Sequence, residues 1–213
     1  VAAQKPDLIV GTDANQGGTQ LPDYDKVAPT VHALFTDTWQ NVITAYGEYF
    51  DEQAKAAKVV DALTEDVADV RAAQPSDPLS ISVLQSYSEG NLLLDMDTSN
   101  TLSSLIADAG FTRPAAETED VDSSKSYGGW SQFSPENLGE HDADVMAIAD
   151  AANYDPKGVT GLAVYPTLDV AKAGNAKTVD GDFWTGGDGF ADHWGIAAPQ
   201  SAARGQRAAL GRR

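Results

Sequence analysis

The feature that most constrains this fold is one long amphipathic segment, residues 50–73. Its apolar side chains recur at spacings of three and four residues, which is the pattern of a helix with one continuous apolar face: Ala56, Val59, Val60, Leu63, Val67 and Val70. At about 1.5 Å per residue, such a helix is about 35 Å long. Two prolines, Pro75 and Pro78, end it sharply. A helix of this length needs something to lie against.

Strand-like and helix-like segments alternate along the rest of the chain. Residues 8–10 form a short apolar run closed by Gly11, as in a buried parallel strand. Further strands are predicted at residues 31–35, 79–84, 91–94, 145–149 and 176–179, and further helices at 39–49, 98–109 (closed by Gly110), 134–137, 167–173 and 189–194, with a polar loop at 112–133. This alternation predicts an open α/β sheet.

The composition argues against several classes of function. The 32 acidic residues outnumber the 14 basic ones and give a net charge of −18, so the surface repels nucleic acid phosphates and anionic lipid. The sequence has no cysteine, which removes a disulfide framework, a thiol nucleophile and a cysteine-ligated metal. No segment approaches the roughly 20 consecutive apolar residues that span a bilayer.

Catalytic motifs are also missing from the sequence. His32, His141 and His193 are scattered, and none lies in an H-E-x-x-H or triad-like context. There is no G-x-S-x-G elbow, and the glycine-rich residues 11–19 lack the Lys-Ser/Thr of a phosphate-binding loop. We therefore predict that the protein is not an enzyme.

Two acidic segments superficially resemble metal sites. Residues 95–99 are similar to the start of a calcium loop, but Asn100 replaces the required glycine and Ile106 stands where a bidentate glutamate is needed. Residues 97–100 are better interpreted as a helix-capping segment. His141 lies among the three carboxylates of residues 140–144, where a solvated loop before the next strand is the favoured interpretation.

Ligand binding fits the chain better than catalysis, because polar loops with aromatic residues follow the predicted strands. Ligands of open α/β sheets bind outside the carboxyl ends of the strands. The loops are residues 12–20, 86–91, 125–132 and 184–188. The third is the most distinctive, since a tyrosine and a tryptophan flank two glycines there. Such rings stack on flat ligand groups, while Lys125 or Arg113 would neutralise an anionic ligand.

Single residues of these loops are the candidate ligand contacts. Tyr127 and Trp130 flank the glycines, and the alternative for both is that they fold back onto their own lobe. Trp39 is either a cleft wall or a helix-packing residue. Tyr87, just past a predicted strand, and Thr185 are placed for ligand contact, and Trp184 and Trp194 are interpreted as structural. The predicted binding set is Trp39, Tyr87, Lys125, Tyr127, Trp130 and Thr185.

Several strings resemble the substrate-binding proteins of iron–siderophore ABC importers, the class III periplasmic binding proteins. Residues 5–11 (KPDLIVG) and 28–30 (APT), followed by a tryptophan, match the first lobe of that family. Residues 109–114, 134–144 and 182–185 match the second lobe in the same order. The resemblance covers most of residues 5–195. It implies an α/β fold of two lobes joined by one long helix.

The resemblance also implies a domain layout. Residues 1–49 are expected to be the remainder of an incomplete N-terminal lobe, 50–73 the interlobe helix, 74–196 the C-terminal lobe and 197–213 an atypical basic tail. We expect the strand at residues 8–10 to be a core strand whose neighbours are partly missing, which leaves an apolar edge exposed. An export signal or lipid anchor is expected outside the printed sequence.

The implied function is capture of a ferric siderophore outside the cytoplasmic membrane and its delivery to an ABC permease. The implied protein is a monomer, anchored as a lipoprotein at the periplasm or cell surface, without a cofactor or metal of its own beyond the chelated iron. Binding of haem or cobalamin, or a non-catalytic interaction domain of the same fold, is the alternative. Three separated histidines disfavour a free metal ion as cargo. The family docks on its permease through acidic residues of each lobe, here Glu48 or Glu52 and Glu89 or Glu136.

Overall fold

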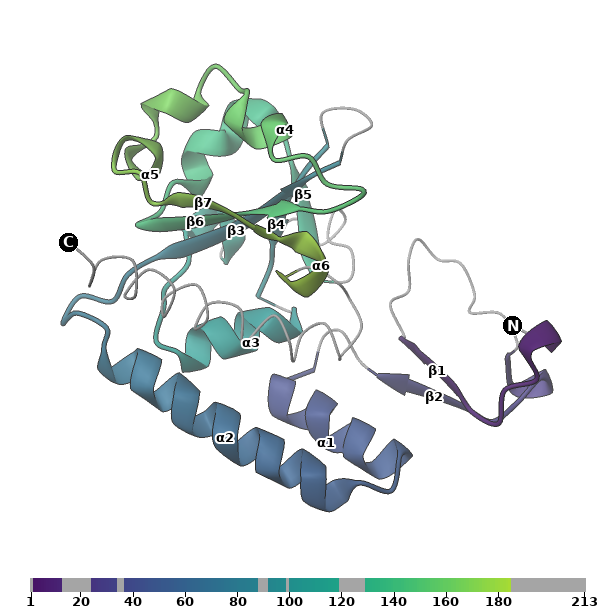
Figure 1. Cartoon of the computed structure of the whole chain (residues 1–213). Helices are drawn as coiled ribbons and strands as arrows, with labels where there is room; N and C mark the ends of the chain where they lie inside the picture. Colours follow the sequence, from purple (N-terminus) through teal and green to yellow (C-terminus); the bar gives the residue numbers. More distant parts are fainter. Residues whose placement is uncertain are drawn as a thin grey trace, which may run out of the picture.

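The structure is a computed structural model that describes residues 2–12, 24–33, 37–87, 92–98, 100–118 and 129–184. Its centre is a five-stranded sheet with helices on both faces (Figure 1). In spatial order the strands are β5 (Trp130–Phe133), β4 (Leu93–Met96), β3 (Ile81–Ser86), β6 (Val145–Asp150) and β7 (Ala176–Asp180). A separate two-stranded sheet precedes them in the chain. The predicted mixed α/β class is confirmed.

The sheet is mixed, with its parallel part on one side of the central strand. β3, β6 and β7 run parallel, whereas β4 is antiparallel to β3 and β5 is antiparallel to β4. All six residues of β3 are buried, as expected for a strand covered on both faces. The parallel strands end together at Ser86, Asp150 and Asp180. We call this end of the sheet, with the turns that follow it, the carboxyl edge.

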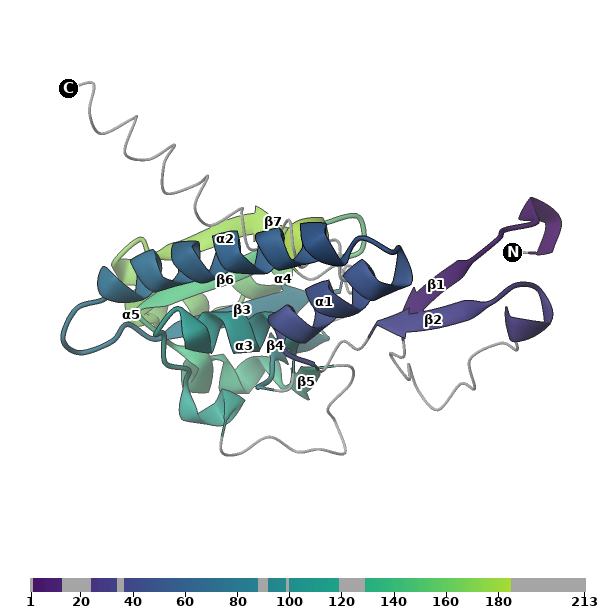
Figure 2. The same ribbon diagram turned by 90° about the horizontal axis from the view of Figure 1, so that it is seen from below.

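Two helices precede the sheet and pack side by side. α1 (Trp39–Tyr49) begins at Thr38, whose Oγ1 accepts a hydrogen bond from the Asn41 amide, N···O 3.3 Å. After a short turn, α2 (Gln53–Ala72) runs back along α1 (Figures 1 and 2). A Cβ on Gly47 would lie 2.4 Å from the Ala56 Cβ, so the glycine lets the helices approach closely. The long helix predicted at residues 50–73 is confirmed as one unbroken helix, which starts three residues later than predicted, at Gln53.

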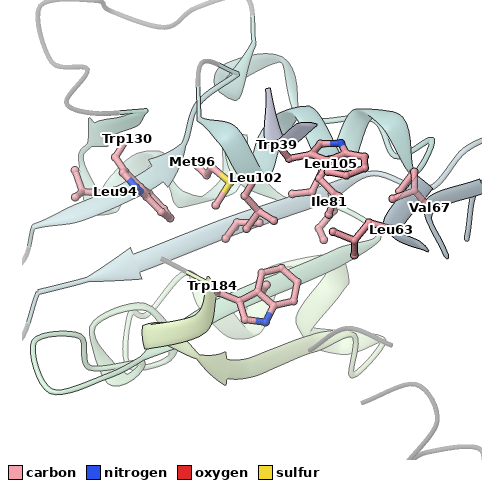
Figure 3. Packing of buried hydrophobic residues seen from close by; sticks show 14 residues of the cluster. Trp39, Leu63, Val67, Ile81, Leu94, Met96, Leu102, Leu105, Trp130 and Trp184 are labelled. Atoms are coloured by element: carbon pink, nitrogen blue, oxygen red, sulfur yellow. The ribbon is translucent and has the colours of Figure 1, made fainter. Parts of the chain in front are cut away.

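The first core cluster lies between these helices and one face of the sheet. α3 (Thr101–Asp108) begins at Asn100, whose Oδ1 accepts from the Leu102 amide, and ends before Gly110, whose φ is +85°. The predicted caps of this helix are confirmed. Buried side chains from α1, α2, α3 and the sheet meet here (Figure 3), among them Trp39, Leu63, Val67, Ile81, Val83, Met96, Leu102, Leu105, Trp130 and Trp184.

A second core cluster fills the opposite face under short helical segments. These are η5 (Pro135–His141), α4 (Lys157–Thr160), η6 (Tyr165–Thr167) and α5 (Asp169–Lys172). The cluster contains Leu84, Leu93, Leu138, Met146, Ile148, Val159, Leu168 and Val170. Pro135 occupies the start of η5 as predicted, although the Ser134 side chain makes no capping bond. The sheet therefore carries apolar side chains on both faces.

Several predicted boundaries were wrong because they depend on contacts distant in sequence. The loop predicted at 112–133 contains η4 (Ala115–Glu117) and ends in β5, which forms by pairing with β4. The helix predicted at 167–173 shrinks to α5, while α4 and the short α6 (Gly181–Trp184) were not predicted. The predicted helix at 189–194 and the basic tail lie outside the described residues.

The N-terminal region is built more sparsely than the sheet that follows it. It contains η1 (Ala2–Gln4), β1 (Ile9–Thr12), η3 (Tyr24–Lys26) and β2 (Thr30–Ala33), and β1 pairs with β2 in parallel. Leu8 and Ile9 are half-buried, whereas Ala28 is the one buried hydrophobic residue among the described side chains of this region. Among the described helices, none has the length and apolar composition needed to cross a bilayer.

Candidate functional site

Two tyrosines mark the carboxyl edge beside the central strand. Tyr87 directly follows β3 and is 37% exposed. It forms an isolated antiparallel bridge with Tyr154, and the ring centroids lie 5.2 Å apart with planes at 77°. An edge-on pair of this kind holds both rings in fixed positions. An exposed aromatic side chain thus lies where ligands of open α/β sheets bind.

The turn that carries Tyr154 is anchored to the end of β3. The Asp155 amide donates to the Ser86 carbonyl at 2.9 Å, and the Tyr87 amide donates to the Leu92 carbonyl at 3.2 Å. A Cβ on Gly158 would lie 1.7 Å from the Ser86 Oγ. A glycine is therefore required where α4 packs against the end of β3. These backbone hydrogen bonds and this close contact fix the turn of Tyr154 against β3.

The described charges at the carboxyl edge are mainly negative. Asp150 and Asp180 end β6 and β7, and Asp155 follows the Tyr154 turn. Lys157, at the start of α4, contributes one positive charge. Carboxylates around a binding surface favour neutral or cationic groups over anionic ones. The edge therefore combines an aromatic pair with acidic surroundings.

The structure supports the helix-packing alternative for Trp39 rather than the cleft wall. Trp39 is only 2% exposed. Its Nε1 donates to Asp108 Oδ2 at 2.9 Å, and its amide donates to Ser104 Oγ at 3.2 Å. These bonds join the start of α1 to α3, so the indole is part of the core.

Trp130 is likewise a core residue, which corrects its placement in a ligand-binding loop. It is the first residue of β5, pairs with Met96 and is 8% exposed in the first core cluster. Figure 3 shows its ring among Leu94, Met96 and the neighbouring core side chains. Trp184 is buried in the same cluster, as predicted. Edge-strand pairing, which sequence periodicity did not reveal, accounts for the difference.

The other predicted contacts fall into two groups. Tyr87 lies at the carboxyl edge as predicted, while Lys125, Tyr127 and Thr185 lie outside the described residues. Arg113 does not face a ligand, since its guanidinium is nearly buried and bonds Glu117. The expectation that Arg113 neutralises an anionic ligand is therefore wrong.

Arg113 and Glu117 belong to a buried polar network under η4 and η5. The guanidinium donates through Nε (2.8 Å) and Nη2 to Glu117 Oε2. The other oxygen, Oε1, accepts from Ser82 Oγ at 2.5 Å and lies 3.2 Å from His141 Nδ1. The Glu117 carboxylate is fully buried. Its charge is compensated by the guanidinium, as buried ions require.

Asp95, close to this network, is a buried carboxyl group with an oxygen that lacks a hydrogen-bond partner among the described residues. It is buried on β4, and its Oδ2 has no hydrogen-bond partner in the described part of the chain. Burial, reinforced by the nearby Glu117 charge, raises the pKa of Asp95 to about 7, although His141 and Arg113 oppose the shift. Ligand atoms of Asp95, Glu117 and His141 all lie within 4.8 Å of one another.

The sequence did not predict this cluster, and the solvated loop favoured for residues 140–144 was wrong for His141, which is 2% exposed at the end of η5. Asp142 instead accepts from the Asp169 and Val170 amides at 2.6 and 3.1 Å, and so caps α5. Asp144 accepts from the amide and hydroxyl of Ser80, both at 2.8 Å. One available signal was a charged residue, Asp95, within the otherwise apolar run of β4.

Three of the four acidic residues named for permease docking are described, and all three are exposed. Glu48 lies in the last turn of α1, and Glu136 lies in the first turn of η5. Glu52 pairs with Lys55 at the start of α2. Glu89 lies outside the described residues.

Comparison with known families and curated proteins gives two matches. The family model "Periplasmic binding protein" matches residues 1–179. The "Probable siderophore-binding lipoprotein YfiY" of Bacillus subtilis (strain 168) is 27% identical over 199 residues, which cover 89% of this chain and 60% of YfiY. The chain thus spans about 60% of the length of this relative.

Solved structures show the same fold at low sequence identity. Staphylococcus aureus SirA complexed with staphyloferrin B aligns with a TM-score of 0.69 at 20% identity, covering 92% of this chain and 70% of SirA. FhuD2 from S. aureus with bound ferrioxamine B aligns with a TM-score of 0.65 at 17% identity, covering 92% and 73%. At such identities the likeness shows the fold alone, that of class III periplasmic binding proteins, which this chain covers in part.

Proposed function

The chain belongs to the periplasmic binding protein family, and we propose that it captures a ferric siderophore outside the cytoplasmic membrane and delivers it to an ABC permease. The observation that carries the proposal is the exposed Tyr87 at the carboxyl end of the central strand of this fold. Three relatives support it: YfiY is described as a probable siderophore-binding lipoprotein, SirA is solved with staphyloferrin B, and FhuD2 is solved with ferrioxamine B. The protein binds its ligand without chemical conversion or a cofactor.

The proposed ligand site extends from the Tyr87–Tyr154 pair along the carboxyl edge. A siderophore wraps its own iron, so the protein needs to offer aromatic, hydroxyl and charged contacts rather than metal ligands. Lys125, Tyr127 and Thr185, named from the sequence, are proposed as further contacts. Trp39 and Trp130 are excluded from this set because both are buried in the core.

The acidic carboxyl edge refines the proposed class of siderophore. Asp150 and Asp180 end β6 and β7, and Asp155 directly follows Tyr154. Lys157, at the start of α4, is the one basic residue in this described part of the carboxyl edge. We therefore propose a preference for neutral or positively charged ferric chelates, such as trihydroxamates, over polyanionic catecholate or carboxylate chelates.

Quenching of intrinsic tryptophan fluorescence tests both the function and the ligand class. The protein is titrated with a neutral ferric trihydroxamate, a cationic one, a ferric catecholate, haem and cobalamin. Saturable quenching by a ferric trihydroxamate supports the proposal. Quenching by haem or cobalamin alone would show that the alternative ligand is bound instead of a siderophore. The absence of binding to every chelate would contradict siderophore capture.

A matched pair of variants then tests the site. Tyr87→Ala removes an exposed ring at the carboxyl end of β3 and should weaken chelate binding by about 1–3 kcal/mol if that ring is an anchor. Leu79→Ala removes an exposed side chain just before the same strand and should leave affinity unchanged. Equal affinities for the two variants would remove Tyr87 from the site.

Delivery to a permease is proposed to use Glu48 on the first side and Glu136 on the second. Charge-neutral variants Glu48→Gln and Glu136→Gln should retain siderophore affinity while lowering siderophore-dependent ATPase activity of the reconstituted cognate permease. Glu140→Gln, another exposed carboxylate on η5, is the control. The proposed location is the periplasm or cell surface, with a lipid anchor and a monomeric protein.

A further inference from the structure

We propose that Asp95, Glu117 and His141 form a buried site for one divalent transition-metal ion, with zinc the best match to the ligands. The three side chains come from β4, η4 and η5, and their ligand atoms lie within 4.8 Å of one another. Two ligand atoms on one zinc ion lie at most about 4 Å apart, so a small inward movement of these side chains would let all three reach one ion. This inference does not depend on the proposed siderophore function.

The donor atoms suit zinc. One imidazole nitrogen and two carboxylate oxygens form a ligand set that Zn²⁺ accepts, and a water molecule can complete its tetrahedron. The His141 ring is held in place by Phe133, with ring centroids 3.9 Å apart. An oriented imidazole beside two carboxylates is better suited to a borderline metal than to calcium or magnesium, which prefer oxygen ligands alone.

The unpartnered Asp95 oxygen is the independent sign that a ligand belongs here. Asp95 is 2% exposed, and its Oδ2 lacks a hydrogen-bond donor among the described residues. Leaving a buried polar atom unpaired is costly, and such atoms in native proteins usually have a partner. A cation between Asp95, Glu117 and His141 would supply that partner.

The surroundings of Glu117 resemble an outer coordination sphere. Arg113 holds Oε2, while its Nη1 donates to Ser103 Oγ at 3.1 Å and its Nη2 donates to the Met96 carbonyl. Ser82 donates to Oε1. Outer partners of this kind fix the orientation of a ligating carboxylate. Arg113 balances only one of the two carboxylates, so ionised Asp95 leaves a negative charge in the cluster for a cation.

The proposed ion has a structural role, separate from iron carried as cargo. Asp95, Glu117 and His141 are each at most 2% exposed, so a siderophore cannot reach them. An ion bound by all three would fasten η4 and η5 to β4. The main competing occupant is a proton on Asp95, which would satisfy the same carboxyl without any metal.

Metal loading of the purified protein distinguishes the two occupants. The protein is stripped with a chelator, incubated with zinc, passed through a desalting column and analysed for zinc by mass spectrometry. The proposal predicts one tightly held zinc per chain and a higher melting temperature with zinc. With cobalt in its place, it predicts the visible absorption of a low-coordinate Co²⁺ site. Absence of retained metal and of the absorption would overturn it in favour of the proton.

Three variants distinguish zinc bound at this site from zinc bound non-specifically to surface carboxylates. Asp95→Asn, nearly isosteric, should abolish stoichiometric zinc retention and the zinc-dependent rise in melting temperature. Ser82→Ala should weaken zinc binding by about 10-fold, as loss of an outer partner does. Glu140→Gln, next to His141 but exposed, should change nothing.

Unchanged zinc binding in a folded Asp95→Asn protein would contradict the proposal. If that variant does not fold, the retained metal and cobalt spectrum of the unmutated protein decide. Siderophore titration of the same preparations tests the proposed function separately.

Discussion

The two sheets of this protein begin from similar sequence signals and reach different degrees of burial. β1 and β3 both begin with an isoleucine, and both pair with a parallel strand. β3 lies at the centre of five strands, and each of its six residues is buried. Among the described strands β1 pairs with β2 alone, and its first residue, Ile9, is half-buried. The number of neighbouring strands and helices accounts for this difference in burial.

The comparison shows why strand sequence alone does not measure stability. A parallel strand gains most when both faces and both edges are covered, and an isolated two-stranded sheet is marginal in water. In the five-stranded sheet, two core clusters cover opposite faces. We therefore expect the five-stranded sheet to carry most of the stability of the described chain.

The largest expected effect comes from matched isoleucine truncations in the two sheets. Ile148→Ala on β6 removes a side chain that is 1% exposed in the second core cluster, and it should cost about 3–4 kcal/mol of unfolding free energy. Ile9→Ala on β1 removes a half-buried side chain and should cost about 1 kcal/mol or less. Urea denaturation measures both values.

Equal losses from the two isoleucine truncations would break the comparison. They would mean that the β1–β2 pair shares the same cooperative core as the five-stranded sheet. Hydrogen exchange provides a second view, because amides of β3 should exchange only on global unfolding, whereas those of β1 should exchange through local opening.

A medium effect is expected where the carboxyl edge is packed most tightly. Gly158→Ala places a Cβ within 1.7 Å of the Ser86 Oγ and 2.6 Å of its Cβ, so it should cost about 1–3 kcal/mol through overpacking. Gly139→Ala, with no atom within 4 Å of the added Cβ, is the matched control and should change stability by about 0.5 kcal/mol or less. Relief of the defect by Ser86→Gly in the same chain would confirm the contact.

The smallest expected effect concerns the helix cap built by Asp142. Asp142→Ala removes the acceptor for the first amides of α5 and should cost about 1 kcal/mol, as loss of a capping side chain does. Glu140→Ala removes a neighbouring exposed carboxylate and should have a negligible effect on the melting temperature. A negligible effect of Asp142→Ala would show that α5 is held by Val170 burial alone.

Local patterns predicted the three longer helices, α1, α2 and α3, and most strands of this fold. The three- and four-residue spacing predicted α2, and the apolar runs predicted β3 and β6 to within two residues. The caps of α3 were also predictable, because Asn100 and Gly110 act through their own backbone neighbourhood. These features depend on residues close in sequence.

The candidate sites were less predictable, since they depend on distant contacts. The position of Tyr87 could be predicted because the residue directly follows a strand. Trp130 lies in a polar segment that is compatible with either a loop or an edge strand. It belongs to a strand because it pairs with Met96 of β4. Asp95, Glu117 and His141 are separated by more than 20 residues in sequence and meet only because η4 and η5 fold over β4. No local pattern brings them together.

The most direct test of the account is to locate the bound iron by nuclear magnetic resonance. High-spin ferric iron broadens nearby amide signals, and the gallium chelate of the same siderophore is the diamagnetic control. We predict selective broadening of Tyr87, Ala151 and Gly181, at or beside the carboxyl edge, with Leu79, Val145 and Asn175 at the opposite end of the strands unaffected. Broadening centred on the opposite end, or no difference between the iron and gallium chelates, would contradict siderophore capture at this edge.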